Sequence, residues 1–138
     1  MYLKSKGIYT VLHSGNITPV LMYYQELLKI DSVFGTNPRM EDKTILGIEI
    51  EDFGSSDFKV KACRKVIEEL GLKKSEIVAI GDSPADKGIF ELAGYSIAIN
   101  PKGDIAQYAD TVIGNDLKQV IPIVENLLIQ AEMHKDLE

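Results

Sequence analysis

The sequence predicts an α/β domain built on a mostly parallel sheet, and two observations carry that prediction. Short apolar runs of strand length alternate along the chain with segments whose apolar residues recur at helical spacing. The run at 77–80 holds no polar residue, which is typical of a central parallel strand that is covered on both faces. Because no repeat, low-complexity tract or linker divides the chain, we expect one domain over residues 1–138.

The first half of the chain predicts strands and helices in alternation. Residues 8–13 form an apolar run that ends in the turn residues Ser14, Gly15 and Asn16. Thr18 as an N-cap, followed by Pro19, predicts a helix that runs to about residue 29. Further elements are a strand at 32–34 before the turn residues Gly35, Asn37 and Pro38, a hairpin arm at 45–50, a loop at 52–57 and a helix at 59–70 that ends at Gly71.

The second half continues the alternation. It predicts the strand at 77–80, a short helix at 84–93 that ends at Gly94, strands at 96–99 and 111–113, and a closing helix from 116 to about 133. Pro122 lies within that last helix pattern and should kink the helix or delay its start.

Composition and charge exclude several classes of function. The 15 basic and 21 acidic residues give a net charge of −6, whereas nucleic-acid binding requires clustered Lys and Arg, so we expect no nucleic-acid partner. No apolar run is long enough to cross a bilayer and no signal peptide is evident near Met1, so we expect no membrane association. The single cysteine, Cys63, excludes an internal disulfide and favours the reducing cytoplasm. Its place on the apolar face of its helix favours a core role.

Polar residues follow the strand predicted at 77–80. Ser83, Pro84 and Asp86 fit a capping box at the start of the next helix, which is a purely structural interpretation. That interpretation does not account for Asp82, a carboxylate at the end of a buried strand and four positions before a second carboxylate. Two hard oxygen ligands around one point suit Mg²⁺. The spacing alone leaves both interpretations open.

Two other places are candidates for binding an anion. At Ser14 and Gly15 a hydroxyl and backbone N–H groups follow a strand and can hold a phosphate, although most such turns are plain connections. Lys59 opens a predicted helix, where a cation opposes the helix dipole. A lysine there is usually a solvated surface charge, but the unfavourable placement also suits a side chain that faces an anion.

Taken together, these segments resemble the haloacid dehalogenase superfamily, and within it the phosphoserine phosphatase-like branch. The family's second motif, an apolar strand that ends in Ser or Thr, is matched at 9–15, and its third, a lysine that starts a helix, by Lys59. Its fourth motif, Gly-Asp-x-x-x-Asp after a strand, is matched at 81–86 and is the most specific. The resemblance covers residues from about 3 to about 128.

The resemblance implies a Rossmann-like three-layer sandwich and a Mg²⁺-dependent phosphomonoesterase that acts on a small phosphorylated substrate. Asp82 would ligate the Mg²⁺, and Asp86 would support the ion directly or through water. Ser14 and the backbone of Gly15 would bind the phosphoryl group, while Lys59 would offset the charge on nucleophile and phosphate.

The sequence departs from the family at its first motif. That motif is an Asp-x-Asp whose first Asp is the covalent nucleophile and whose second is a general acid, and no Asp-x-Asp occurs in these 138 residues. We therefore expect the first family strand and the cap insertion to be missing. The strands that end at Ser14 and Gly81 would then pair directly, or a partner chain or second copy would fill the gap. Ala85, where phosphoserine phosphatases commonly carry Asn, leaves the substrate open, and Asn16 is the candidate substrate contact.

Three functions are compatible with these features. The first is a phosphomonoesterase whose nucleophile lies in a longer parent or in a partner chain. The second is a non-catalytic relative that binds Mg²⁺ or a phosphorylated ligand without turnover, and the third is a structural or interaction module that retains only the fold. In each case we expect this chain alone to be inactive.

Overall fold

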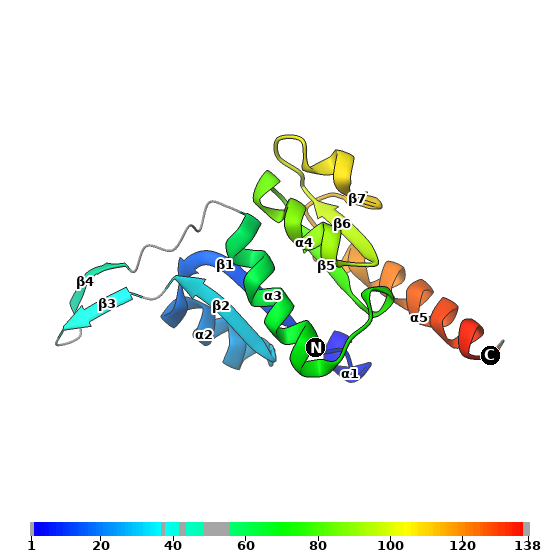
Figure 1. Ribbon diagram of the computed structural model, residues 1–138, viewed down its shortest axis with the longest axis horizontal. Helices are drawn as coiled ribbons and strands as arrows, with labels where there is room; N and C mark the ends of the chain where they lie inside the picture. Colours follow the sequence, from blue (N-terminus) through cyan, green and yellow to red (C-terminus); the bar gives the residue numbers. More distant parts are fainter. Residues whose placement is uncertain (1, 37, 42–43, 49–55, 137–138) are drawn as a thin grey trace. The chain divides into compact units, whose positions relative to one another are not determined.

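The computed structural model describes residues 2–36, 38–41, 44–48 and 56–136 (Figure 1). The chain divides into two compact units, Met1–Lys73 and Lys74–Glu138. Every strand pair of the described residues lies within one of these two units. The expected single domain over residues 1–138 stays a prediction.

The first unit contains a parallel strand pair and an antiparallel hairpin. Strands β1 and β2 pair in parallel, and β3 and β4 pair antiparallel. In chain order the elements are α1 (Tyr2–Ser5), β1 (Val11–Ile17), α2 (Thr18–Leu28), β2 (Ser32–Thr36), β3 (Pro38–Glu41), β4 (Thr44–Ile48) and α3 (Ser56–Leu70).

Gly35 serves the packing of α2 against β2. Leu21 is the buried side chain of α2, and a Cβ built on Gly35 would lie only 2.4 Å from Leu21 Cδ1. A glycine inside the strand therefore makes room for the helix side chain. The predicted turn at Gly35 and Pro38 is wrong, because Gly35 lies within β2 and Pro38 opens β3. Asn37, most of the predicted loop at 52–57 and the end of the predicted arm at 45–50 lie outside the described residues.

Strand β1 does not end where its polar residues begin. It continues through Ser14, Gly15 and Asn16 to Ile17, so the turn predicted there is wrong. Between the pairs His13–Phe34 and Ile17–Thr36, β1 advances four residues while β2 advances two. This irregular register is typical of a β-bulge, which bends a strand and redirects its side chains. Glycine and short polar residues favour turns and bulges alike, so local sequence did not distinguish them.

Helix α3 ends as the sequence predicts. Gly71 adopts a left-handed φ of +64° and donates to the carbonyl of Glu68 at 3.2 Å, while the N–H of Leu72 donates to the carbonyl of Ile67 at 3.1 Å. These two bonds form a Schellman motif, which requires a left-handed residue after the helix. Glycine is the residue that adopts this conformation at least cost.

The second unit is a three-stranded parallel sheet with strand order β5-β6-β7, accompanied by helices (Figure 1). Its elements are η1 (Lys74–Glu76), β5 (Val78–Gly81), η2 (Pro84–Asp86), α4 (Lys87–Leu92), β6 (Tyr95–Ile99), η3 (Ile105–Tyr108), β7 (Thr111–Ile113), η4 (Leu117–Gln119) and α5 (Val120–Asp136). The core of this unit includes Ile89, Phe90, Ile97, Ala98, Ile105, Val120 and Val124.

The central strand of this sheet is β6 rather than β5. Ile97 and Ala98 of β6 are 0% exposed, whereas Val78 at the start of β5 is 40% exposed, so β5 is an edge strand within its unit. The apolar run at 77–80 is therefore a misleading sign of a central strand. The central strand β6 instead carries a buried serine, Ser96, whose polar atoms are satisfied by hydrogen bonds to Asp110.

The predicted delay of the closing helix is confirmed. A 3₁₀ turn at Leu117–Gln119 precedes α5, which begins at Val120, so Pro122 falls in the first turn of the α-helix. A proline is tolerated there because the first N–H groups of a helix have no intrahelical partner. Within the described part of the chain, none of the helices combines the length and apolarity that crossing a membrane demands.

Candidate functional site

The loop after β5 begins with a short and tightly defined turn. Gly81 is the last residue of β5, and the 3₁₀ turn Pro84–Asp86 leads into α4. Ser83 takes the N-cap position in an extended conformation, with φ −140° and ψ 165°. The N–H of Asp86 donates to the carbonyl of Ser83 at 2.9 Å, which closes the turn.

The carboxylate of Asp86 holds this loop together from inside. Its side chain is 1% exposed, and its Oδ2 accepts the backbone N–H of Asp82 at 2.9 Å and that of Ser83 at 3.1 Å. The bond from Ser83 is the one that an N3 residue makes in a capping box. A Cβ on Gly81 would lie 2.4 Å from Asp86 Cγ, so glycine at 81 is what admits the carboxylate. The capping interpretation therefore accounts for Asp86.

The carboxylate of Asp82 has a different environment. Its side chain is 48% exposed, and the Nζ of Lys102 lies 3.7 Å from Asp82 Oδ2. That separation is an ion pair but is too long for a hydrogen bond. Asp82 follows the last residue of β5, at the carboxyl edge of a parallel sheet, where ligands bind in open α/β folds.

The two carboxylates fit a magnesium site unequally. Mg²⁺ prefers one or two carboxylates and keeps several waters. The exposed Asp82 fits the role of a direct ligand, whereas Asp86 already binds two N–H groups and fits the role of a support for the loop that carries the ligand. The described residues hold no cluster of three or more His, Cys, Asp or Glu side chains that would coordinate an ion without further ligands.

Ser14 lies in the irregular part of β1 and is half-buried. Its Oγ accepts the backbone N–H of Asn16 at 3.1 Å, and Asn16 itself is exposed. A hydroxyl whose oxygen accepts one hydrogen bond can still donate its proton to another group. This geometry suits donation to an oxyanion such as a phosphate oxygen.

Lys59 lies in the first turn of α3 and is half-buried. Cys63 lies one helical turn after Lys59 in α3. Burial raises the pKa of the Cys63 thiol above its ordinary value, and the charge of Lys59 opposes that rise. Cys63 is half-buried and lies outside the fully buried core, and a raised pKa makes its thiol less reactive.

The predicted site residues fall into two sets. Ser14, Gly15, Asn16 and Lys59 belong to the unit Met1–Lys73, and Asp82 and Asp86 belong to the unit Lys74–Glu138. The structure brings Ser14 together with Asn16, and Asp86 together with the backbone of Asp82. The binding roles of all six residues stay predictions.

Lys102, a neighbour of Asp82, is a site residue that the sequence did not predict. The backbone N–H of this residue donates to the carbonyl of Asp82 at 2.8 Å, so the turn after β6 lies directly beside the loop after β5. A signal was available, because Pro101 and Gly103 flank the lysine and mark a turn at the end of a predicted strand. In a parallel sheet that turn necessarily emerges at the same edge as Asp82.

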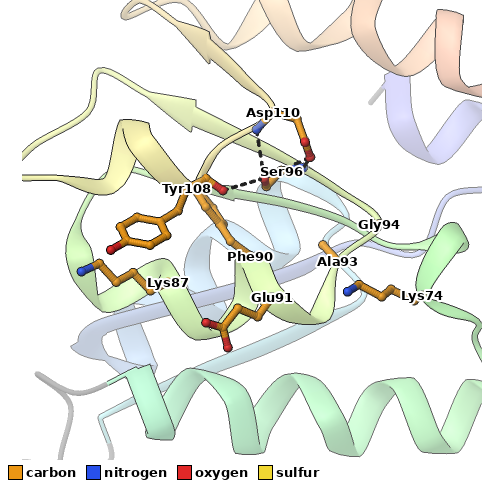
Figure 2. A pocket seen from close by; sticks show the side chains of 9 residues that line it. All are labelled: Lys74, Lys87, Phe90, Glu91, Ala93, Gly94, Ser96, Tyr108 and Asp110. Carbon is orange, nitrogen blue, oxygen red and sulfur yellow. Dashed lines mark hydrogen bonds between the residues drawn. The ribbon is translucent and has the colours of Figure 1, made fainter.

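A pocket of about 290 Å³ lies elsewhere in the second unit (Figure 2). It lies at the amino ends of the strands, where Ser96 of β6 hydrogen-bonds to Asp110, just before β7. Because the three strands are parallel, this is the edge opposite Asp82. The pocket is lined by Lys74, Lys87, Phe90, Glu91, Ala93, Gly94, Ser96, Tyr108 and Asp110, and neither Asp82 nor Asp86 lines it.

Comparison with known proteins defines the class of this chain. Residues 2–91 match the model of the haloacid dehalogenase-like hydrolase family, and the chain belongs to that family. It is 27% identical over 111 residues to a phosphoserine phosphatase of Haemophilus influenzae, covering 80% of this chain and 35% of that protein. It is also 27% identical over 124 residues to the phosphoserine phosphatase of Campylobacter jejuni subsp. doylei, covering 89% of this chain and 60% of the relative.

Solved structures agree with this assignment. A phosphoserine phosphatase in its apo form superposes with a TM-score of 0.80 at 25% identity, covering 88% of this chain and 61% of that one. The predicted α/β, Rossmann-like class and the phosphoserine phosphatase-like branch are therefore confirmed. The chain spans 35% and 60% of the lengths of the two relatives named above.

Proposed function

We propose that this chain forms the phosphate- and metal-binding part of a Mg²⁺-dependent phosphomonoesterase of the phosphoserine phosphatase-like type. The observation that carries the proposal is the contrast between two carboxylates four residues apart. Asp86 is buried and bonded to the backbone of the loop, while Asp82 is exposed at the carboxyl edge of the sheet. A buried support that holds an exposed carboxylate is the arrangement expected of a metal ligand and its outer shell.

Each residue then has a distinct task. Asp82 would hold Mg²⁺, which supplies positive charge to a phosphoryl group in transfer. The Ser14 hydroxyl, whose oxygen already accepts from Asn16, would donate to a phosphate oxygen together with the N–H of Gly15. Lys59 would offset the negative charge that gathers there, and the exposed Asn16 would contact the rest of the substrate.

The nucleophile must come from elsewhere in this proposal. Covalent phosphoryl transfer needs an acceptor carboxylate, and the 138 residues contain no Asp-x-Asp. We infer that residues outside this sequence supply it, either in a longer chain or in a partner. Without that supply the chain would bind Mg²⁺ and phosphate and turn nothing over.

Two measurements test the proposal. Mg²⁺ titration to tens of millimolar should shift the backbone amide signals of residues 81–87 in the wild type but not in Asp82→Asn. With Mg²⁺ present, inorganic phosphate should bind the wild type more tightly than Ser14→Ala. If neither titration moves a signal, the chain is a structural or interaction module and the proposal is wrong.

The purified chain should also release no inorganic phosphate above background from p-nitrophenyl phosphate or phosphoserine with Mg²⁺. Release that survives repeated purification and disappears in Asp82→Asn would contradict the inferred external nucleophile. It would mean that another carboxylate of this chain, or of a second copy, accepts the phosphoryl group.

A further inference from the structure

Two separate contacts place Lys102 beside Asp82. Its backbone N–H donates to the carbonyl of Asp82 at 2.8 Å, and its Nζ lies 3.7 Å from Asp82 Oδ2. The first contact belongs to the main chain and does not depend on where the side chain points. The ion pair between the side chains can therefore break while the main-chain hydrogen bond remains.

The main-chain position of Lys102 is firmly held. Gly103, the next residue, has a left-handed φ of +60°, and a Cβ there would lie 2.9 Å from Pro84 Cγ. Any side chain at 103 would therefore strain the backbone and press on the loop that carries Asp82. The turn after β6 and the loop after β5 thus fit against each other at a glycine.

The ammonium group of Lys102 is loosely held by contrast. The side chains of Lys102 and Asp82 are 70% and 48% exposed, and a separation of 3.7 Å leaves no hydrogen bond between them. Exposed ion pairs of this kind contribute little to stability, because solvent screens the attraction and the lysine loses side-chain freedom. A divalent cation at the same carboxylate would outcompete a single ammonium charge.

We propose that Lys102 is a displaceable counter-ion of Asp82 that becomes an anion-binding residue once a divalent cation takes its place. This inference rests on the proposed function, in which Asp82 holds Mg²⁺. Mg²⁺ and the ammonium group repel each other, so the ammonium group leaves the carboxylate when the ion binds. The fixed main chain keeps it at the same edge of the sheet, where a phosphate attracted by the metal would meet it.

The first test measures Mg²⁺ affinity by calorimetry and amide shifts, independently of any enzymatic activity. Lys102→Gln should bind Mg²⁺ about two- to five-fold more tightly than the wild type, because the competing pair is lost. Lys102→Arg keeps the charge and should resemble the wild type. Lys118→Gln, which removes an equal charge from the exposed turn η4, is the matched control and should leave the affinity unchanged.

The second test measures the coupling between two ligands. Inorganic phosphate should bind the wild type more tightly when Mg²⁺ is present, and this enhancement should fall at least about two-fold in Lys102→Gln. Without Mg²⁺ the two proteins should bind phosphate alike, because Lys102 is then engaged with Asp82. Unfolding curves of the three variants should match that of the wild type, since the changed side chains are exposed.

The outcomes separate this inference from the proposed function. If the wild type binds Mg²⁺ and Lys102→Gln binds it with the same affinity, the counter-ion role is wrong and the metal site stands. An equal gain in Lys118→Gln would show a general charge effect and would also overturn the inference. If neither the wild type nor Lys102→Gln binds Mg²⁺ at tens of millimolar, both the metal site and the inference are wrong.

Discussion

The carboxylate of Asp31 ties together the starts of two parallel strands by bonding to Thr10. Its Oδ2 accepts the backbone N–H of Thr10 at 2.8 Å and the Thr10 hydroxyl at 3.2 Å, while Lys4 pairs with its Oδ1 at 3.0 Å. Thr10 directly precedes β1 and Asp31 directly precedes β2. The carboxylate therefore satisfies a backbone donor at the point where the ladder between the strands begins.

The same device recurs in the second unit. Asp110 directly precedes β7, and its Oδ2 accepts the backbone N–H of Ser96 on β6 at 2.9 Å and the Ser96 hydroxyl at 3.2 Å. In both places an aspartate before one parallel strand binds a hydroxyl residue at the start of its neighbour. These aspartates are structural, which separates them from the exposed Asp82.

Asp31→Asn should reduce the free energy of unfolding by about 1 kcal/mol at pH 7, because the acceptor of the Thr10 hydrogen bonds loses its charge and its pairing with Lys4. The Thr10 N–H, together with Lys4, lowers the pKa of Asp31 below its ordinary value of 3.8. Stability from a carboxyl with a lowered pKa is fully present above its ordinary value and is lost as the pH falls through the lowered one. The difference between wild type and variant should therefore shrink below about pH 4.

Urea unfolding at a series of pH values measures this effect. Glu91→Gln, which removes an exposed carboxylate, is the control and should show no such trend. A constant gap between wild type and Asp31→Asn down to pH 2.5 would contradict the assigned role of Asp31.

The two carboxylates of the Gly81–Asp86 loop should respond oppositely to substitution. Asp86→Ala leaves the N–H groups of Asp82 and Ser83 without their acceptor and should cost about 2 kcal/mol, more than a lost cap alone. Asp82→Asn breaks only a weak exposed pair and should stay within about 0.5 kcal/mol of wild type in the absence of metal. Chemical denaturation decides, and equal losses in both variants would mean that Asp82 is structural.

Gly81→Ala should destabilise the protein by about 1–3 kcal/mol, because its Cβ would lie 2.4 Å from Asp86 Cγ. Gly114→Ala is the matched control, since the nearest atom to its Cβ is Gln119 Oε1 at 3.7 Å, and it should be neutral. In an Asp86→Gly background all three atoms that clash, Cβ, Cγ and Oδ2 of Asp86, are absent, so the two costs should be less than additive by about 1 kcal/mol. If the two losses of stability are additive, the contact between residues 81 and 86 is not what destabilises Gly81→Ala.

Cys63 should react slowly with a thiol reagent in the native protein. Burial raises the pKa of its thiol, so the reactive thiolate is scarcer than in the unfolded chain at the same pH. Lys59→Gln removes the opposing charge and should slow the reaction further. Labelling monitored at pH 8 with and without denaturant checks this, and equal rates in both conditions would rule out the buried position.

Local signals were enough to predict much of the fold. The spacing of apolar residues and Gly71 placed α3 and its end, and Pro122 predicted the late start of α5, because capping and proline effects act within one turn. The Gly-Asp-x-x-x-Asp run likewise identified the loop after β5 and the family, since Gly81 and Asp86 are fixed by contacts within this short run.

Contacts between distant residues decided the rest. The burial of Ser96 in the central strand β6 depends on hydrogen bonds to Asp110, and that Ser14 sits in a bulge depends on the register with β2. Lys102 likewise reaches Asp82 only because parallel strands end at one edge, whereas the packing of Asp86 against Gly81 is local in the sequence. Sequence alone determines which groups are present and how the chain turns locally. Tertiary structure decides which of those groups is buried and bonded where the hydrogen-bond partner lies far along the chain, as Asp110 does for Ser96.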